Sequence, residues 1–237
     1  MKWLIAIVVA LGILYIGSLV YLAVSVAQFT AYWKKQNNAK APQTALVYVA
    51  LGDSAAQGIG AYTPSADYVA QFAKRLATHQ QRPVHVVNLS KSGAKIQDVI
   101  NDQIPQLNTY HPDVITLDIG GNDIAVFDKN TFEREFAKLI SLLPPKTLVA
   151  NVPYFGGRTQ LPLLGAGTPE RSVLTANKII LNLAKQKPVV VVPLHDVTAR
   201  RTGRRIWYYA PDYFHPNNLG YKAWTDAFWM TYLNSIK

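Results

Sequence analysis

The sequence predicts a three-layer α/β domain that follows one N-terminal transmembrane helix. Three observations lead to this fold class. An uncharged apolar run fills most of the first 33 residues, five later apolar runs alternate with helical patterns, and short polar blocks follow those runs. The 237 residues are 49% hydrophobic and only 16% charged, which excludes an intrinsically disordered chain.

The N-terminal segment is expected to be a retained signal anchor that covers residues 1–35. No charged side chain occurs from Trp3 to Trp33, and this run exceeds the roughly 20 residues that a bilayer-spanning helix needs. It is also about twice the length of the apolar core of a cleavable signal peptide, roughly 7–15 residues. Cleavage after Ala27 is the alternative, because Ser25 and Ala27 satisfy a small-x-small rule.

Residues 36–44 form a polar linker, and residues 45–237 form the predicted folded domain. Five near-continuous apolar runs indicate strands that are buried on both faces, as in a parallel sheet covered by helices. These runs are Ala45–Leu51, Val84–Leu89, Asp113–Ile119, Thr147–Val152 and Pro188–Pro193. Helical patterns follow them at Ala66–His79, Ala94–Leu107, Thr131–Leu143, Pro169–Lys187 and about Asn217–Ile236. The repeated order of strand and helix predicts a doubly wound domain.

Composition and charge exclude several classes of function. The chain has no Cys, so disulfides, thiolate metal sites and a Cys nucleophile are excluded. The net charge of +10 is too diffuse to indicate a nucleic-acid partner, although it favours contact with an anionic membrane surface. The one dense basic cluster is typical of a solvated loop, with a lipid or polymer contact as the alternative. It comprises Arg200, Arg201, Arg204 and Arg205.

Polar blocks stand just after four of the predicted elements, where the carboxyl ends of parallel strands place binding sites. The blocks are Gly52-Asp53-Ser54, Asn88 to Gly93, Gly120-Gly121-Asn122-Asp123, and Asp212 to Asn217. A Ser hydroxyl needs a base to remove its proton, and His215 can serve because the pKa of histidine lies near neutrality. Asp212, three residues upstream, can orient that histidine.

An ester carbonyl under attack becomes an oxyanion, which needs preorganised hydrogen-bond donors. The candidate donors are the N–H groups of Ser54 and Gly93 and the side-chain amide of Asn122. Glycine at position 93 would allow the backbone to approach a substrate closely. Asp53 and Asp123 are expected to brace their loops by hydrogen bonds. His195 and the adjacent Asp196 are the only rival to the pair of His215 and Asp212, and they are expected to form a supporting polar pair.

These blocks resemble the signature of the SGNH hydrolases, the GDSL-type esterase/lipase family, over about residues 45–236. The central residues of that signature correspond here to Ser54, Gly93, Asn122 and His215. The resemblance implies a flavodoxin-like sheet of about five parallel strands and a triad of Ser54, His215 and Asp212. It also implies an oxyanion hole made by Ser54, Gly93 and Asn122, and no metal or organic cofactor. Ala55 stands where the family's name has Leu, at a position that is not catalytic.

The functional hypothesis is a membrane-anchored serine esterase or lipase that forms an acyl-enzyme on Ser54. Its substrate would be a carboxylic ester in a lipid, a lysophospholipid or an acylated envelope sugar. An O-acyltransferase that uses the same triad on a cell-envelope sugar is one alternative, and a catalytically silent membrane-bound binding module is another. By similarity to anchored family members, the domain is expected on the extracytoplasmic side of the membrane.

Two further segments are candidates for the walls of the substrate site. Residues 156–169 form a loop with apolar side chains that would serve either as a surface loop or as an acyl-binding wall. Trp207, Tyr208 and Tyr209 precede the Asp-His block and would either line the pocket or pack in the core.

Overall fold

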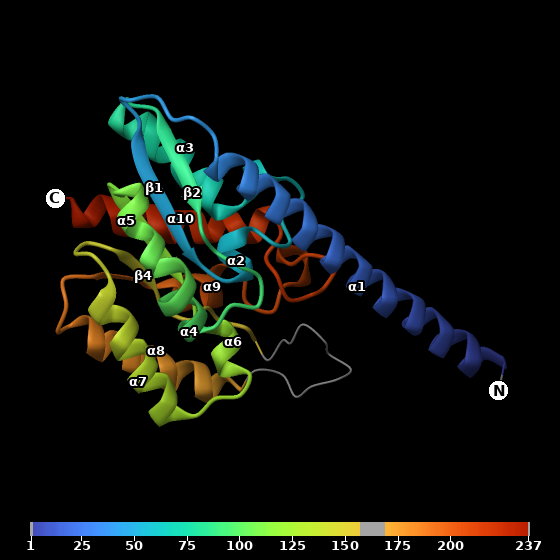
Figure 1. Ribbon diagram of the computed structural model, residues 1–237. Coiled ribbons are helices and arrows are strands. Elements are labelled where there is room, and N and C mark those ends of the chain that lie inside the picture. Colours follow the sequence, from blue (N-terminus) through green and yellow to red (C-terminus); the bar gives the residue numbers. More distant parts are fainter. Residues whose placement is uncertain (1, 157–168, 237) are drawn as a thin grey trace.

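The computed structural model describes residues 2–156 and 169–236, and its centre is a parallel five-stranded sheet (Figure 1). The strand order is β2-β1-β3-β4-β5. The strands are β1 (Leu46–Gly52), β2 (Val84–Asn88), β3 (Val114–Asp118), β4 (Leu148–Ala150) and β5 (Val190–Val192). All five lie within the predicted runs or extend them by one residue. This arrangement confirms the predicted α/β fold class.

Helices cover both faces of the sheet. The longer helices are α1 (Lys2–Asn37), α3 (Tyr68–Gln80), α7 (Lys129–Leu142), α8 (Glu170–Ala184), α9 (Leu194–Arg201) and α10 (Asn218–Ser235). Shorter helical turns are α2 (Ser54–Gln57), α4 (Ile96–Asp98), α5 (Leu107–Tyr110) and α6 (Gly121–Ile124). One apolar core lies between the sheet and α3, α10 and the end of α1, and a second lies between the sheet and α7 and α8. The sequence pattern did not predict α9.

The predicted helix over residues 94–107 is broken into short pieces. After α4 the chain makes a π-helical turn over Val99–Gln103 and a 3-10 turn over Ile104–Gln106. Pro105 has no N–H to continue an α-helix. Gln103 is buried and reaches across to β1, where its side-chain oxygen accepts from Gly52 N and its amide donates to Gly52 O, both at 2.8 Å. The irregular turn therefore supports the end of the central strand.

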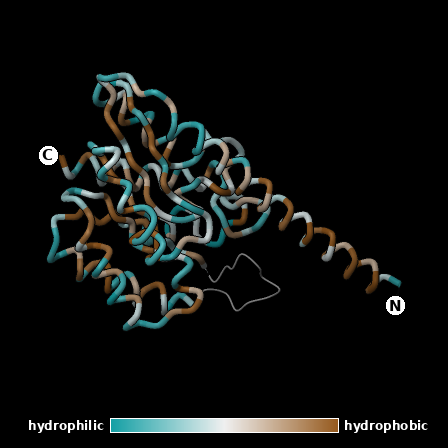
Figure 2. The backbone as a smooth tube through the Cα atoms, viewed as in Figure 1, coloured by the Kyte–Doolittle hydropathy of each residue, from teal (hydrophilic) through white to brown (hydrophobic). Residues whose placement is uncertain are grey.

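Helix α1 has two halves with different surroundings. Its N-terminal part projects away from the rest of the molecule, and apolar residues dominate it (Figure 2). It is long and apolar enough to be a candidate membrane span. Its C-terminal part packs on the sheet domain and buries Ser25, Phe29 and Trp33. The division into residues 1–35, 36–44 and 45–237 stays a prediction, although residues 36 and 37 belong to α1.

The docked end of α1 reaches the turn that follows β1. Trp33 donates its indole N–H to Gln57 O at 2.8 Å, and Gln57 donates its side-chain amide to Thr30 Oγ1 at 2.9 Å. Gly58 lets the helix come this close, because a Cβ there would lie 2.6 Å from the Phe29 ring. At its last residue, Asn37 exchanges two hydrogen bonds with the backbone of Asn88 at the end of β2.

Candidate active site

Ser54 is the first residue of α2, immediately after the central strand. Asp53 precedes it as the N-cap of α2, and its carboxylate accepts from Ala55 N at 3.0 Å. The parallel register pairs Gly52 with Asp118 and Ala50 with Asn88. The sheet therefore brings the loops after β1, β2 and β3 to one edge, as the sequence predicted.

Ser54, His215 and Asp212 form one continuous hydrogen-bonded chain. His215 Nε2 lies 2.9 Å from Ser54 Oγ, and His215 Nδ1 lies 2.6 Å from Asp212 Oδ2. A carboxylate only accepts, so Nδ1 carries the proton and Nε2 is left to accept from the serine hydroxyl. All three residues are at least 96% buried. The structure thus brings together the three residues of the predicted triad.

In the loop before α10, the Asp212 carboxylate accepts hydrogen bonds from three N–H groups, one of them on the His215 ring. Its Oδ1 accepts from the backbone N–H groups of Phe214 and His215, each at 3.0 Å. Burial alone would raise the pKa of Asp212, but these bonds and the His215 ring outweigh burial and hold the pKa below its ordinary value. Tyr213, which lies between Asp212 and Phe214, adopts a left-handed φ of 56°, which makes the tight turn possible at some cost in strain.

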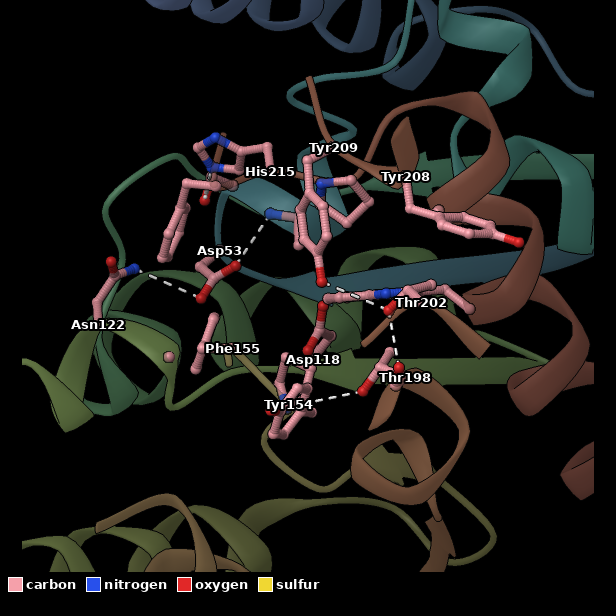
Figure 3. A pocket seen from close by; sticks show the side chains of 18 residues that line it. Asp53, Asp118, Asn122, Tyr154, Phe155, Thr198, Thr202, Tyr208, Tyr209 and His215 are labelled. Atoms are coloured by element: carbon pink, nitrogen blue, oxygen red, sulfur yellow. Dashed lines mark hydrogen bonds between the residues drawn. The ribbon is translucent and has the colours of Figure 1, made fainter. Parts of the chain in front are cut away.

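Asn122 lies in α6 and lines the pocket with Ser54, whereas Gly93 lies in the loop after β2 and outside the pocket lining. The Asn122 amide donates to Ala94 O at 2.9 Å and is 3.4 Å from Asp53 Oδ2, the contact drawn in Figure 3. Gly93 has a φ of 81°, which favours glycine, and a Cβ there would meet no atom within 4 Å. The space beside the Gly93 backbone is therefore open. The hydrogen bond from Asn122 to Ala94 joins α6 to the loop that contains Gly93.

Several carboxyl groups near Ser54 have raised pKa values. Burial raises the pKa of Asp53 to about 6, and burial likewise raises the pKa of Asp123 to about 6. Burial and the neighbouring Asp53 raise the pKa of Asp118 well above its ordinary value. Asp53 caps α2 and contacts Asn122, and Asp123 accepts from Ile96 N at 3.4 Å. Both predicted bracing roles are seen.

A pocket opens beside Ser54 and His215, and aromatic side chains make much of its wall (Figure 3). Tyr208 and Tyr209 line it, as one of the two sequence interpretations expected, whereas Trp207 is 60% exposed and lies outside its lining. The sequence reasoning missed Asp118, Thr198, Thr202, Tyr154, Phe155 and Trp224, which also line the pocket. The loop proposed as an acyl-binding wall lies largely at residues 157–168, outside the described residues.

His195 belongs to a separate polar group. Its Nε2 lies 2.7 Å from Glu170 Oε1, its Nδ1 lies 3.4 Å from Asp196 Oδ1, and its backbone N–H donates to Asn151 Oδ1. These contacts join the starts of α8 and α9, so His195 ties the two helices together. Within residues 2–156 and 169–236, no group of three His, Asp or Glu side chains has the arrangement of a metal site.

A buried Ser–His–Asp chain at the carboxyl edge of a parallel sheet is an arrangement that serine hydrolases share on several folds. The sequence profile of the GDSL-like lipase/acylhydrolase family matches residues 50–223. The chain therefore belongs to this family, the SGNH hydrolases. It is also similar to the spore germination lipase LipC of Bacillus licheniformis, with 24% identity over 198 residues that cover 76% of this chain and 93% of the relative.

Solved structures share the fold. The crystal structure of TesA superimposes with a TM-score of 0.65 at 18% identity, covering 80% of this chain and 99% of that one. A family 3 carbohydrate esterase of Clostridium thermocellum gives 0.62 at 20% identity, covering 80% and 96%. Axe2, an acetylxylan esterase from Geobacillus stearothermophilus, gives 0.56 at 18% identity, covering 79% and 94%. Family membership supports a carboxylic ester hydrolase.

Proposed function

We propose that this chain is a membrane-anchored serine esterase in which Ser54 is the nucleophile. The observation that carries the proposal is the hydrogen-bonded chain from Ser54 Oγ through His215 to Asp212, with distances of 2.9 and 2.6 Å. It provides a nucleophile, a base and an acceptor that fixes the base in the required tautomer. Residues 1–35 would anchor the chain, and residues 45–237 would carry the chemistry.

The reaction would proceed through an acyl-enzyme. Ser54 Oγ attacks the ester carbonyl while His215 Nε2 takes its proton. The resulting oxyanion accepts hydrogen bonds from the N–H groups of Ser54 and Gly93 and from the Asn122 amide. The tetrahedral intermediate collapses, and the alcohol leaves with the proton from His215. Water, deprotonated by the same histidine, then releases the acid and restores Ser54 Oγ.

The proposed substrate is an ester of a lipid, a lysophospholipid or an acylated envelope sugar. Two observations support an apolar or surface-borne substrate: the aromatic residues in the pocket wall and the apolar N-terminal helix. No cofactor takes part in the proposed reaction, because the triad supplies both nucleophile and base. Transfer of the acyl group to a sugar hydroxyl would use the same acyl-enzyme, so the products must distinguish hydrolysis from transfer.

The test is turnover of p-nitrophenyl esters from acetyl to palmitoyl by the full-length chain in detergent micelles. Ser54→Ala is expected to lower turnover by about four orders of magnitude or more and to abolish labelling by a fluorophosphonate. Ser141→Ala is the matched control, because its hydroxyl bonds Lys138 O on α7 away from the pocket. Full activity in Ser54→Ala would refute the nucleophile. Inactivity of a folded wild-type chain, even with an acceptor sugar, would favour the silent binding module.

We also propose that α1 is retained and that the domain lies outside the cytoplasm. Cleavage after Ala27 would cut inside the docked half of α1 and remove the buried Ser25. The mass of the mature protein tests retention, since a chain that begins at residue 28 would contradict it. Protease digestion of intact cells tests sidedness, and a fully protected domain would place it in the cytoplasm.

A further inference from the structure

The first observation is that the docked and apolar parts of α1 overlap. The hydroxyl oxygen of Tyr15 is buried, and Tyr21 donates its hydroxyl to Gly60 O at 3.3 Å. Contact with the domain therefore begins near Tyr15, well inside the apolar stretch. Only Trp3–Leu14 precede it, and about 12 helical residues measure roughly 18 Å.

That free length is too short for a bilayer. The hydrocarbon core is about 30 Å thick and needs roughly 20 residues of helix. A helix that starts its crossing at Trp3 would end it near Leu22. The part of the domain beside Leu22 would then lie at the depth of the lipid headgroups, and the part beside Tyr15 would lie about 10 Å deeper.

The second observation is the character of the surface at that place. The five large apolar side chains there, here called the apolar rim, are between 55% and 62% exposed. They are Tyr62, Ile206, Trp207, Tyr213 and Leu219. Tyr and Trp with an apolar body and a polar tip are enriched at membrane–water interfaces.

Hydrogen bonds hold the rim together and next to α1. Tyr62 N donates to Asn218 Oδ1 at 2.8 Å, which places Tyr62 beside the start of α10 and Leu219. Asn217 donates its amide to Trp207 O at 2.8 Å, which ties the Ile206–Trp207 turn to the same helix end.

Two residues in or next to the rim lie within electrostatic reach of α1. The electrostatic neighbours of the Tyr21 hydroxyl are Asp212, adjacent in sequence to Tyr213, and Tyr62. Figure 1 shows the loops that precede α10 lying beside the middle of α1.

The third observation is charge. Arg204 and Arg205 directly precede Ile206, and both are exposed. Arginine at a membrane surface attracts anionic lipids and hydrogen-bonds phosphate oxygens. A basic pair beside exposed aromatic residues fits a layer of lipid headgroups better than it fits an apolar protein partner.

We propose that the domain lies directly on the membrane that α1 crosses, with the apolar rim immersed among the headgroups and Arg204 and Arg205 on lipid phosphates. The proposal rests on the anchoring role of α1 in the proposed function. Tyr208 and Phe214 line the pocket, and their sequence neighbours Trp207 and Tyr213 belong to the rim. The pocket therefore opens at the bilayer surface, and an ester held in the bilayer can enter it without crossing water.

The test measures depth with a fluorophore on single cysteines, which is clean because the chain has no Cys. Full-length chains with Trp207→Cys, Leu219→Cys, Val8→Cys or Leu142→Cys are placed in phosphatidylcholine–phosphatidylglycerol vesicles. Lipids with a spin label near the headgroup or near the chain end serve as quenchers. Leu142 is the matched control, because it is 45% exposed and lies at the end of α7, at the opposite edge of the sheet.

The rim labels are expected to shift to shorter wavelength and to be quenched most by the headgroup spin label. Val8 would lie about 7 Å from the headgroup level at Trp3, roughly midway to the bilayer centre, so it is expected to be quenched by both labels, and Leu142 by neither. Quenching at Val8 with rim labels that behave like Leu142 would overturn the rim and leave the anchor intact. No quenching at Val8 would overturn both. Neither result depends on catalysis, so the quenching experiment tests the membrane contact independently of the esterase hypothesis.

A second pair of measurements addresses the charge and the route of the substrate. Arg204→Glu with Arg205→Glu is expected to reduce rim quenching in anionic vesicles and to leave it unchanged in pure phosphatidylcholine. Leu219→Asp is expected to lower turnover of an ester embedded in vesicles and to leave turnover of a soluble acetyl ester unchanged. Equal turnover of the embedded ester by Leu219→Asp and wild type would contradict entry from the bilayer.

Discussion

Removal of the docked half of α1 should unfold or inactivate the enzyme, whereas removal of the free half should not. The comparison uses one variant that begins at residue 15 and one that begins at residue 40. The first keeps Phe29 and Trp33, which are 1% and 4% exposed, and the second lacks both. Residue 40 is the natural boundary for a chain whose helix is only an anchor, so the two variants separate an anchor from a structural element.

The size of the effect follows from these two side chains. Truncating a buried Phe or Trp costs about 3–5 kcal/mol, so losing both amounts to roughly 6–10 kcal/mol before the site relaxes. The whole free energy of unfolding of a domain is about 5–15 kcal/mol. Loss of Trp33 also leaves Gln57 O without its donor, and Gln57 in turn accepts from Ser92 N in the loop that holds Gly93. The loss should therefore reach the loop of Gly93, one of the proposed oxyanion donors.

The assay is urea unfolding by circular dichroism, with p-nitrophenyl acetate turnover measured on the same samples. The variant from residue 15 is expected to match the full-length chain in detergent in both respects. The variant from residue 40 is expected to unfold at much lower urea or to be insoluble. Equal unfolding midpoints and equal turnover in the two variants would refute the reasoning, since α1 would then contribute nothing to the domain. A Trp33→Ala chain of full length should show part of the same loss.

Two further predictions concern the carboxyl groups. Asp212→Asn presents an amide donor to His215 Nδ1, which forces the proton onto Nε2, so kcat should fall about 10⁴-fold. Asp226→Asn is the control, because Asp226 forms a surface ion pair with Arg75, and it should retain activity. Similar rates in the two variants would count against the tautomer argument. Asp123 has its pKa raised from 3.8 to about 6, mainly by burial, so its protonated form stabilises the fold below pH 3.8 and that stability is lost as the pH rises through about 6. The free energy of unfolding of Asp123→Asn, measured with urea, should equal that of wild type at pH 4 and exceed it at pH 7 by up to roughly 3 kcal/mol. A difference that does not change with pH would contradict this account.

The sheet was predictable because each strand is a short apolar run that is buried on both faces. The triad was predictable because Ser54, Asp212 and His215 stand in short polar blocks after such runs. In both cases the signal is local in the sequence, and the parallel sheet supplies the long-range contact by bringing all strand ends to one edge.

The features that sequence reasoning missed depend on distant contacts. Nothing near Gln103 signals that its side chain bonds the backbone of Gly52, and this contact accompanies the break in the predicted helix. Thr198 and Thr202 enter the pocket only because α9 forms where the pattern showed a loop. The uncharged run of α1 predicts a membrane helix equally well whether or not Phe29 and Trp33 are buried, so its docking could not be foreseen.

The unbroken course of α1 fixes how far the active site can travel. A flexible linker of about nine residues would allow excursions of roughly 15–18 Å, but the bonds from Trp33 and Asn37 remove that freedom. In a membrane, helix and domain would turn and drift laterally as one body. Ser54, the proposed nucleophile, would stay at one height above the membrane and meet substrates only by lateral movement. Its rate would then follow the mole fraction of ester in the bilayer rather than the bulk concentration, and esters held farther from the membrane would be out of reach.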